Sequence, residues 1–342
     1  MPALFISDPD RMNAALHPRQ ALFDEGDAAT LLPVVDHYCG VEARMRKSLE
    51  LQAQMGPVFD ITLDCEDGAP IGGEVEHAAL VAELLNSPLN GHGRVGARVH
   101  PLDHASFEAD VDALISKAGA KLAYLMVPKP RSAKEVADAC DFIDATCARH
   151  GVKQPPVHTL IETHGALREV QQIAAHPRIE SLSFGLMDFV SAHRGAIPRS
   201  GLTVQGQFNH PLVVRAKLEI AAAAHAHAKT PSHCVVTEFK NAAALQEAAT
   251  RAAREFGYTR MWSIHPNQIQ PIIDAFAPSV AEIDEAVEIL QAAQAAHWAP
   301  IQHRDSLHDR ASYRFFWHLL QRAHGTSQPL PVEIRQAWFG TA

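Results

Sequence analysis

Eight short segments rich in apolar and β-branched residues recur along this chain, mostly about 30 residues apart, and a helix-forming stretch follows each one. Near-continuous apolar segments are typical of strands that are covered on both faces, as in parallel sheets with crossover helices. Eight such units favour a (β/α)8 TIM barrel, an α/β fold, over an open six-stranded sheet. No GxGxxG follows any segment, which disfavours a dinucleotide-binding sheet. The predicted strands are residues 31–38, 58–66, 95–100, 122–129, 157–163, 181–185, 233–238 and 261–265.

The barrel does not account for the whole chain. We expect an N-terminal arm over residues 1–29, the barrel over 30–276 and a C-terminal helical extension over 277–342. The extension is expected to serve as a lid or an oligomerisation segment. Ser279, followed three residues later by Glu282, predicts a capped start for the first helix of the extension.

A second helix of the extension, over residues 311–323, is rich in aromatic residues. Its aromatic side is expected to be buried either between subunits or against the barrel. Residues 297–308 are expected to be irregular, and residues 329–342 to form a surface arm.

Composition excludes several classes of protein. The 30 basic and 39 acidic residues give a net charge of −9, and no basic run occurs, which argues against nucleic-acid binding. No apolar run approaches the ~18 residues of a membrane span. The five cysteines are odd in number and show no CxxC spacing, so neither a disulfide framework nor a zinc knuckle is expected. The first residues lack the pattern of a signal peptide, and we expect a cytoplasmic protein.

Polar side chains close each of the eight predicted strands. Burying such groups within a strand costs several kcal/mol each, so we expect them at the carboxyl-end rim, where TIM barrels build their active sites. These residues are Asp36, His37, Asp64, Glu66, Arg98, His100, Lys129, Glu162, Ser183, Asp188, Glu238 and His265.

Three carboxylates stand within four residues at the end of the second predicted strand. Asp64 and Glu66 point to the same side of a strand, and Asp67 follows them. A catalytic cluster is one interpretation. The alternative is structural, because such acids also cap turns or pair with an arginine, and taken alone the motif favours that alternative.

Glu162 and Asp188 form a second candidate. Glu162 ends the fifth strand, and Asp188 follows the sixth after Gly185, which lets the backbone approach closely. Neighbouring parallel strands lie about 4.8 Å apart, so the two carboxylates can converge. One or two carboxylates suit Mg²⁺ when water and substrate complete its coordination. The alternative is that both acids are simply solvated in loops and bind no ion.

Two cationic residues end strands beside these acids. Arg98 can balance the carboxylates, hold a substrate carboxylate through two hydrogen bonds, or do both. Lys129 could form a Schiff base, as in class I aldolases, but the acids would then need separate explanations. No GxSxG, HExxH or Walker motif occurs.

With these residues in view, residues 30–325 resemble the citrate lyase beta-subunit-like family, within the HpcH/HpaI aldolase superfamily that includes malyl-CoA and citramalyl-CoA lyases. Each motif is weak alone, but six in order at fitting spacings are specific. The family motifs LDLED, VRVN, LPK, IET, FGxxD and IHPxQ correspond to Leu63–Asp67, Ala97–His100, Val127–Lys129, Ile161–Thr163, Phe184–Asp188 and Ile264–Gln268.

The resemblance implies a role for each matching residue. Glu162 and Asp188 fall on the Mg²⁺ ligands of the family, with Mn²⁺ as an alternative ion. Arg98 falls on the arginine that contacts substrate. Glu66 and Asp67 fall on the acids that support the waters of the metal.

Two further residues complete the assignment. His265, in the IHPxQ motif, is assigned to substrate binding together with Asp67. Asp309 falls on a C-terminal aspartate of the family lyases that reaches a neighbouring subunit's site and exchanges a proton there. The family commonly forms trimers or hexamers, so a homotrimer or hexamer is expected.

The hypothesis is therefore a Mg²⁺-dependent carbon–carbon lyase that cleaves a 3-hydroxy acid, or its acyl-CoA thioester, into a keto acid and an acyl fragment. The catalytic residues would be Arg98, Asp309 and Glu66. One alternative is a class II aldolase that acts on pyruvate-type acids without coenzyme A. The other is a catalytically silent scaffold subunit, because the first strand lacks the family's arginine–serine pair and His100 replaces an asparagine.

Overall fold

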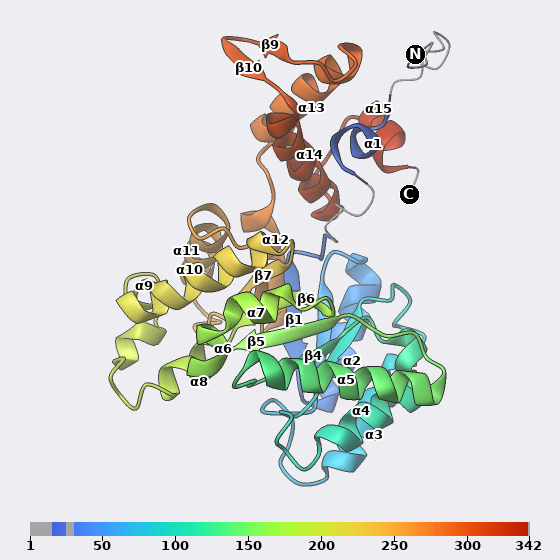
Figure 1. Ribbon diagram of the computed structural model, residues 1–342, viewed down its shortest axis with the longest axis vertical. Coiled ribbons are helices and arrows are strands. Elements are labelled where there is room, and N and C mark those ends of the chain that lie inside the picture. Colours follow the sequence, from blue (N-terminus) through green and yellow to red (C-terminus); the bar gives the residue numbers. More distant parts are fainter. Residues whose placement is uncertain (1–15, 25–30, 341–342) are drawn as a thin grey trace, which may run out of the picture. The chain divides into compact units, whose positions relative to one another are not determined.

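The computed structural model describes residues 16–24 and 31–340, which belong to two compact units. Residues 32–276 form the barrel unit, and residues 277–340 form the C-terminal unit together with the described residues that precede 32. In the barrel unit, eight parallel strands close in chain order, and β1 pairs with both β2 and β8. Helices surround the strands (Figure 1), which confirms the predicted TIM barrel.

Every barrel strand is short. The strands are β1 Val35–Cys39, β2 Asp60–Asp64, β3 Val95–Arg98, β4 Leu125–Val127, β5 Val157–Ile161, β6 Ile179–Phe184, β7 Thr230–His233 and β8 Arg260–Ser263.

Helices connect these strands. The α-helices of the barrel unit are α2 Glu42–Met55, α3 Glu74–Leu85, α4 Phe107–Ala118, α5 Ala133–His150, α6 His164–Arg168, α7 Val170–Ala175, α8 Leu186–Ser191, α9 Val204–Gln207, α10 Pro211–Ala226, α11 Ala242–Arg254 and α12 Ile269–Phe276. The 3-10 helices are η2 Gly119–Lys121, η3 Arg199–Leu202 and η4 Pro266–Gln268.

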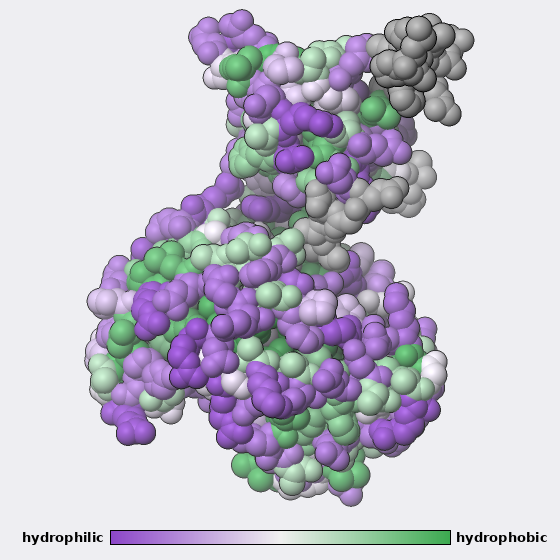
Figure 2. All heavy atoms as spheres, viewed as in Figure 1, coloured by the Kyte–Doolittle hydropathy of each residue, from purple (hydrophilic) through white to green (hydrophobic). Residues whose placement is uncertain are grey.

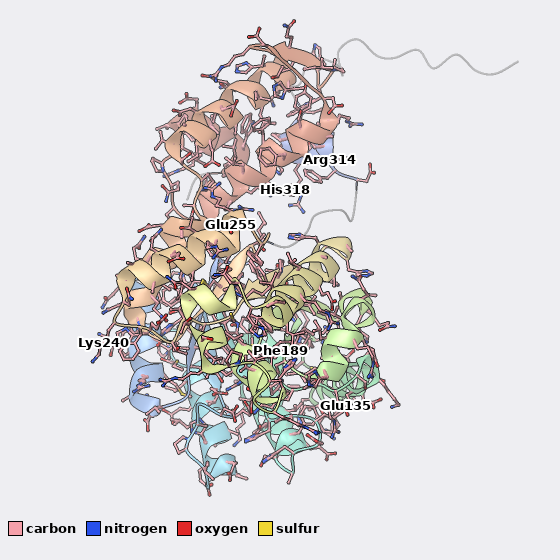
Figure 3. All side chains as sticks on the ribbon, turned by 90° about the vertical axis from the view of Figure 1, so that its left-hand side faces the viewer. Glu135, Phe189, Lys240, Glu255, Arg314 and His318 are labelled. Atoms are coloured by element: carbon pink, nitrogen blue, oxygen red, sulfur yellow. The ribbon has the colours of Figure 1, made fainter. Side chains whose placement is uncertain are left out.

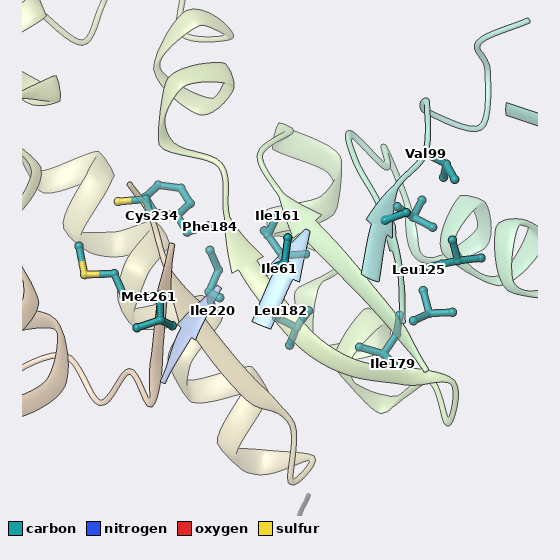
Figure 4. Packing of buried hydrophobic residues seen from close by; sticks show 14 of the residues in the cluster. Ile61, Val99, Leu125, Ile161, Ile179, Leu182, Phe184, Ile220, Cys234 and Met261 are labelled. Atoms are coloured by element: carbon teal, nitrogen blue, oxygen red, sulfur yellow. The ribbon is translucent and has the colours of Figure 1, made fainter. Parts of the chain in front are cut away.

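The main hydrophobic core lies between the strands and the helices. Alternate strand residues, such as Ile61 and Leu63 of β2, face outward into this layer and are completely buried. Figure 4 shows part of the layer, including Ile161, Leu182 and Met261. Each such side chain contributes about 1.5–3 kcal/mol on burial. On the face seen in Figure 2, hydrophilic and hydrophobic residues of this unit are interspersed over the outer surface.

The inside of the barrel is polar at the amino ends of the strands. The Tyr124 hydroxyl donates to Asp36 Oδ1 at 3.1 Å, and this bond joins two strands that are not neighbours, so it crosses the interior. Arg260 is fully buried and pairs with Asp36 and Asp60. A smaller apolar layer of Met126, Leu160 and Trp262 is also buried.

Two expectations about the strands are wrong. The seventh strand is Thr230–His233, not residues 233–238. The apolar run Cys234–Val236 suggested a strand at residues 233–238. Closure of the barrel instead pairs the preceding residues with β6, so that Thr230 lies opposite Ser181. Glu238 therefore lies five residues beyond the strand.

The second error concerns Asp36. It was expected at the rim but lies in the barrel interior, fully buried. Arg260, Thr62 and Tyr124 contact its carboxylate there. The cost of desolvation was the reason to expect Asp36 at the rim, but this ion pair and these hydrogen bonds offset that cost.

The C-terminal unit has a core of its own. Its elements are α1 Pro18–Leu22, α13 Val280–Ala295, β9 Ile301–His303, β10 Ser306–His308, α14 Arg310–Gly325, α15 Val332–Ile334 and the π-helix Arg335–Phe339. Ser279 and Glu282 form the predicted capping box of α13.

The aromatic helix α14 fills this core. Tyr313, Phe316 and Trp317 are buried within the unit. The aromatic side of this helix was expected to be covered by another subunit or by the barrel, but the C-terminal unit itself covers most of it. Arg314 and His318 lie one turn apart on α14 (Figure 3), and both contact the Phe23 ring.

Two segments of this unit are more ordered than expected. The stretch 297–308 contains the β9–β10 hairpin instead of being irregular. The tail was expected as a surface arm but buries Trp338 in the core of the unit. The greater part of the expected N-terminal arm lies outside the described residues. Within the described ranges, no helix combines the length and the apolarity that a membrane span requires.

The Arg260 ion pairs predict a large loss of stability on substitution. Arg260→Met should lower the free energy of unfolding by about 3–5 kcal/mol, because it leaves Asp36 buried without its cation and removes the nearer of the two cations of Asp60. Urea unfolding followed by circular dichroism measures the change. Arg215→Met is the control, because its i,i+4 pair with Glu219 is exposed and contributes about 0.5 kcal/mol or less. Equal losses in the two variants would contradict the prediction.

Candidate active site

A buried ion pair lies at the carboxyl ends of β2 and β3. Arg98 Nε donates to Asp64 Oδ1 at 2.7 Å, and its Nη2 donates to Oδ2 at 2.8 Å. The two residues lie opposite each other in the strand register, so this two-point contact follows from the sheet itself. Burial lowers the pKa of Arg98 to about 10, although Glu162 and Asp188 raise it, so the guanidinium is charged at neutral pH.

The remaining acids of the LDLED-like motif contact two cations. Glu66 Oε2 lies 2.9 Å from Arg98 Nη1, and Glu66 Oε1 contacts Lys129 Nζ. Asp67 Oδ2 lies 2.7 Å from the same ammonium. The structural interpretation of this motif therefore holds for Asp64, whose carboxylate is taken up by Arg98 and by backbone N–H groups.

Glu162 follows β5 and is almost completely buried. Its Oε1 accepts the backbone N–H of Lys129 at 2.8 Å. A Cβ atom at position 185 would lie only 2.0 Å from Glu162 Oε2, so the carboxylate needs a glycine there. Burial, reinforced by the charge of Asp188, raises the pKa of Glu162 to about 8.

Asp188 lies in the first turn of α8 and its side chain is partly exposed. Its Oδ1 is 3.8 Å from Lys129 Nζ. The charge of Asp188 helps to raise the pKa of Glu162, and the convergence of the two carboxylates on one ion stays a prediction.

Lys129 lies among these carboxylates and pairs with Glu66, Asp67 and Asp188. Burial lowers the pKa of Lys129, but the hydrogen bonds that its ammonium donates to Asp67 and Glu66 outweigh this effect and raise the pKa above the usual value. A Schiff-base lysine must lose its proton to react, so this environment opposes the class I aldolase alternative.

The donor set suits a divalent cation. Asp64, Glu66, Asp67, Glu162 and Asp188 bring five carboxylates to one rim, against the two cationic groups of Arg98 and Lys129. Within the described ranges, no three metal-binding side chains already converge as a preformed site. Two oxygen ligands from protein, with excess negative charge around them, nevertheless match the preference of Mg²⁺ for few carboxylates and several waters.

The other two predicted residues lie elsewhere. His265 follows β8, where its Nδ1 accepts the Asn267 backbone N–H at 3.2 Å and its ring stacks on Phe239. Asp309 belongs to the C-terminal unit and is exposed. It caps α14 by accepting the Ala311 N–H at 2.9 Å, so its catalytic role stays a prediction.

A cavity of about 700 Å³, which the sequence pattern did not predict, adjoins the ends of β1 and β8. Two basic residues of α2, Arg44 and Lys47, line it together with His265. Arg44 and Lys47 are three residues apart on a helix that directly follows the first strand, and this spacing could have indicated a basic wall of a cavity. The cavity was missed because its wall combines segments that are far apart in the sequence.

The raised pKa of Glu162 predicts a pH dependence of stability without metal. Between the ordinary pKa of 4.5 and the folded value of about 8, the folded protein keeps a proton that the unfolded chain loses. The free energy of unfolding therefore falls through this window, by up to about 1.4 kcal/mol per pH unit. The side chain introduced by Glu162→Gln cannot bind this proton, so the stability of that variant does not fall in the same way. In urea titrations with EDTA, the free energy of unfolding of the variant relative to wild type should therefore rise from pH 5 to pH 8. A constant difference would contradict the assignment.

Comparisons with known proteins identify the family of this chain. Residues 55–266 match the model of the family described as HpcH/HpaI aldolase/citrate lyase. The chain is 28% identical over 247 residues to an L-malyl-CoA/beta-methylmalyl-CoA lyase of Cereibacter sphaeroides, covering 69% of this chain and 77% of the relative.

Solved structures extend the likeness. A citrate lyase from Burkholderia xenovorans is 53% identical, with a TM-score of 0.82, over 94% of this chain and 98% of the other. A Mycobacterium tuberculosis protein, solved with magnesium, acetoacetate and coenzyme A, has a TM-score of 0.66 over 87% of this chain and 100% of the other. At 21% identity it supports the fold alone. As its motifs predicted, the chain belongs to the HpcH/HpaI aldolase/citrate lyase family of carbon–carbon lyases.

Proposed function

We propose that this protein is a Mg²⁺-dependent lyase that cleaves the carbon–carbon bond of a 3-hydroxy acid carried as a coenzyme A thioester. The observation that carries the proposal is the pair of Glu162 and Asp188 beside the buried Arg98. The names of the relatives support a hydroxyacyl-CoA substrate, and the preference of Mg²⁺ for few carboxylates and several waters supports the ion. Mn²⁺ is the alternative ion.

Each residue has a distinct role in this proposal. Glu162 and Asp188 would hold the ion, and Glu66 and Asp67 would order its waters. A divalent ion, when bound, supplies Lewis-acid polarisation of the substrate oxygen that becomes the keto group. The Arg98 guanidinium is fixed by Asp64, so its charge stays in place to orient and neutralise a substrate carboxylate. His265, on the wall of the cavity, would contact the substrate there.

Cleavage also requires proton transfer. The substrate hydroxyl gives up a proton as its carbon–carbon bond breaks, and the acyl fragment, released as an enolate, takes one up. We assign that exchange to Asp309 from the C-terminal unit, acting in a homotrimer or hexamer on a neighbour's site.

The cavity provides a place for the thioester arm. Its volume is in the usual range for small-molecule sites, and Arg44 and Lys47 place positive charge where phosphate groups would bind. A catalytically silent scaffold would need neither this cavity nor the carboxylate pair.

The metal assignment predicts that Asp188→Asn and Glu162→Gln reduce lyase turnover by at least about 100-fold while the chain stays folded. The assay follows release of keto acid from hydroxyacyl-CoA thioesters in the presence of Mg²⁺, and circular dichroism monitors folding. Glu219→Gln, an exposed glutamate on α10, is the control and should keep full activity. Full turnover by either site variant would refute the assignment.

The thioester assignment predicts a charge effect in the cavity. Lys47→Glu should raise KM for the thioester by about tenfold, because it places a carboxylate beside the phosphate groups. Arg46→Glu is the matched control on the same helix, since Arg46 is absent from the cavity wall and pairs with Glu42 and Glu83. Parallel assays with free hydroxy acids separate the two enzyme hypotheses, because a coenzyme A-independent aldolase would cleave the free acid and be insensitive to Lys47.

A further inference from the structure

Lys129 connects three segments of the candidate site with one side chain. Its ammonium contacts Glu66, lies 2.7 Å from Asp67 Oδ2 and lies 3.8 Å from Asp188 Oδ1. These acids follow β2 and β6, whereas the lysine follows β4. The side chain is about a quarter exposed, so its charge is only partly screened by water.

The backbone of Lys129 is also committed to the site. Its φ is +50°, in the left-handed region that side chains other than glycine rarely adopt. In that conformation its N–H donates to Glu162 Oε1 at 2.8 Å. An unfavourable backbone conformation is maintained where the surrounding structure requires it, and functional sites are common places for this. The same residue therefore orients one proposed metal ligand and contacts the other.

Charge explains why a cation is needed at this point. Five carboxylates meet at the rim, and the two-point contact with Asp64 occupies much of Arg98. Within the described part of the chain, Lys129 makes the only ion pair of Asp188. Without that ammonium and without a divalent ion, Glu66, Asp67 and Asp188 would repel one another.

We propose that Lys129 is a positioning residue that holds the carboxylate cluster together without a divalent ion and competes with that ion for Asp188. This inference rests on the proposed function, because it takes Glu162 and Asp188 as the metal ligands. The ammonium stays on Glu66 and Asp67 when the ion binds. Its charge keeps metal binding weaker than the carboxylates alone would make it.

The size of the competition follows from electrostatics. Asp188 Oδ1 is 3.8 Å from the ammonium, so a Mg²⁺ ion held by that oxygen at about 2.1 Å would lie at most about 6 Å from it. Even at the dielectric constant of water, repulsion between a single and a double positive charge at that distance changes a dissociation constant by about tenfold.

The test compares Lys129→Met with wild type in two measurements. Isothermal titration with MgCl₂ should show binding that is about tenfold tighter in the variant, because the repulsion is gone. In EDTA, the variant should melt about 3 °C or more below wild type, because Asp67 and Asp188 lose their cation and Glu66 keeps only Arg98. Added Mg²⁺ should therefore raise the Tm of the variant by more than it raises the Tm of wild type.

Two further variants act as controls. Lys134→Met removes an exposed lysine that also contacts a carboxylate, Asp138, and should change neither quantity. Lys129→Arg restores the charge and should return the Mg²⁺ affinity toward that of wild type. If the methionine variant does not fold, Lys129→Gly accommodates the left-handed backbone and removes the whole side chain with its ammonium, and the same results are expected.

The outcomes separate the two proposals. Wild-type protein that binds no Mg²⁺ would reject the proposed metal-dependent lyase, and the melting comparison in EDTA would still test Lys129. Wild-type binding with unchanged or weaker affinity in Lys129→Met would overturn the Lys129 proposal alone. An unchanged Tm in EDTA would overturn it as well, because the cluster would then not need the ammonium.

Discussion

The two-point ion pair between Arg98 and Asp64 is the contact on which the mouth of the barrel depends. Both side chains are buried, so neither could be there without the other. The guanidinium lies over the Tyr38 ring, which stacks on Trp262, so the pair is fixed to β1 and β8 as well as to its own strands. A cation held this firmly can serve a bound substrate without having to be ordered first.

The acids around this pair show how one group of residues serves structure and chemistry together. Asp64 and Glu66 satisfy Arg98 and Lys129, as a purely structural cluster would. Glu162 and Asp188 are different, because no two-point contact with an arginine neutralises them. Burial, reinforced by the charge of Asp188, raises the pKa of Glu162, which makes Glu162 a candidate functional group.

The sequence was a good guide to the fold because the signal for each strand is local. Seven of the eight predicted strands coincide with observed ones, since alternate outward-facing residues such as Ile61 and Leu63 make the runs strongly apolar. The predicted position of the seventh strand was wrong because Thr230 and Pro231 are not typical strand residues. Closure of the barrel imposes their pairing with β6. The positions of Asp36 and Arg260 could not be predicted either, because they depend on contacts across the interior.

By itself, the sequence determined the number of strand–helix units, the family and most of the polar residues at the strand ends, with Asp36 and Glu238 as exceptions, because these properties depend on neighbours along the chain. Tertiary structure decided which of those residues meet. It assigned Asp64 to Arg98, placed the Lys129 ammonium among three carboxylates and buried the aromatic residues of α14 in a core of their own. The physical reason is that ion pairing and burial act between groups far apart in the chain, and only closure of the barrel fixes their distances.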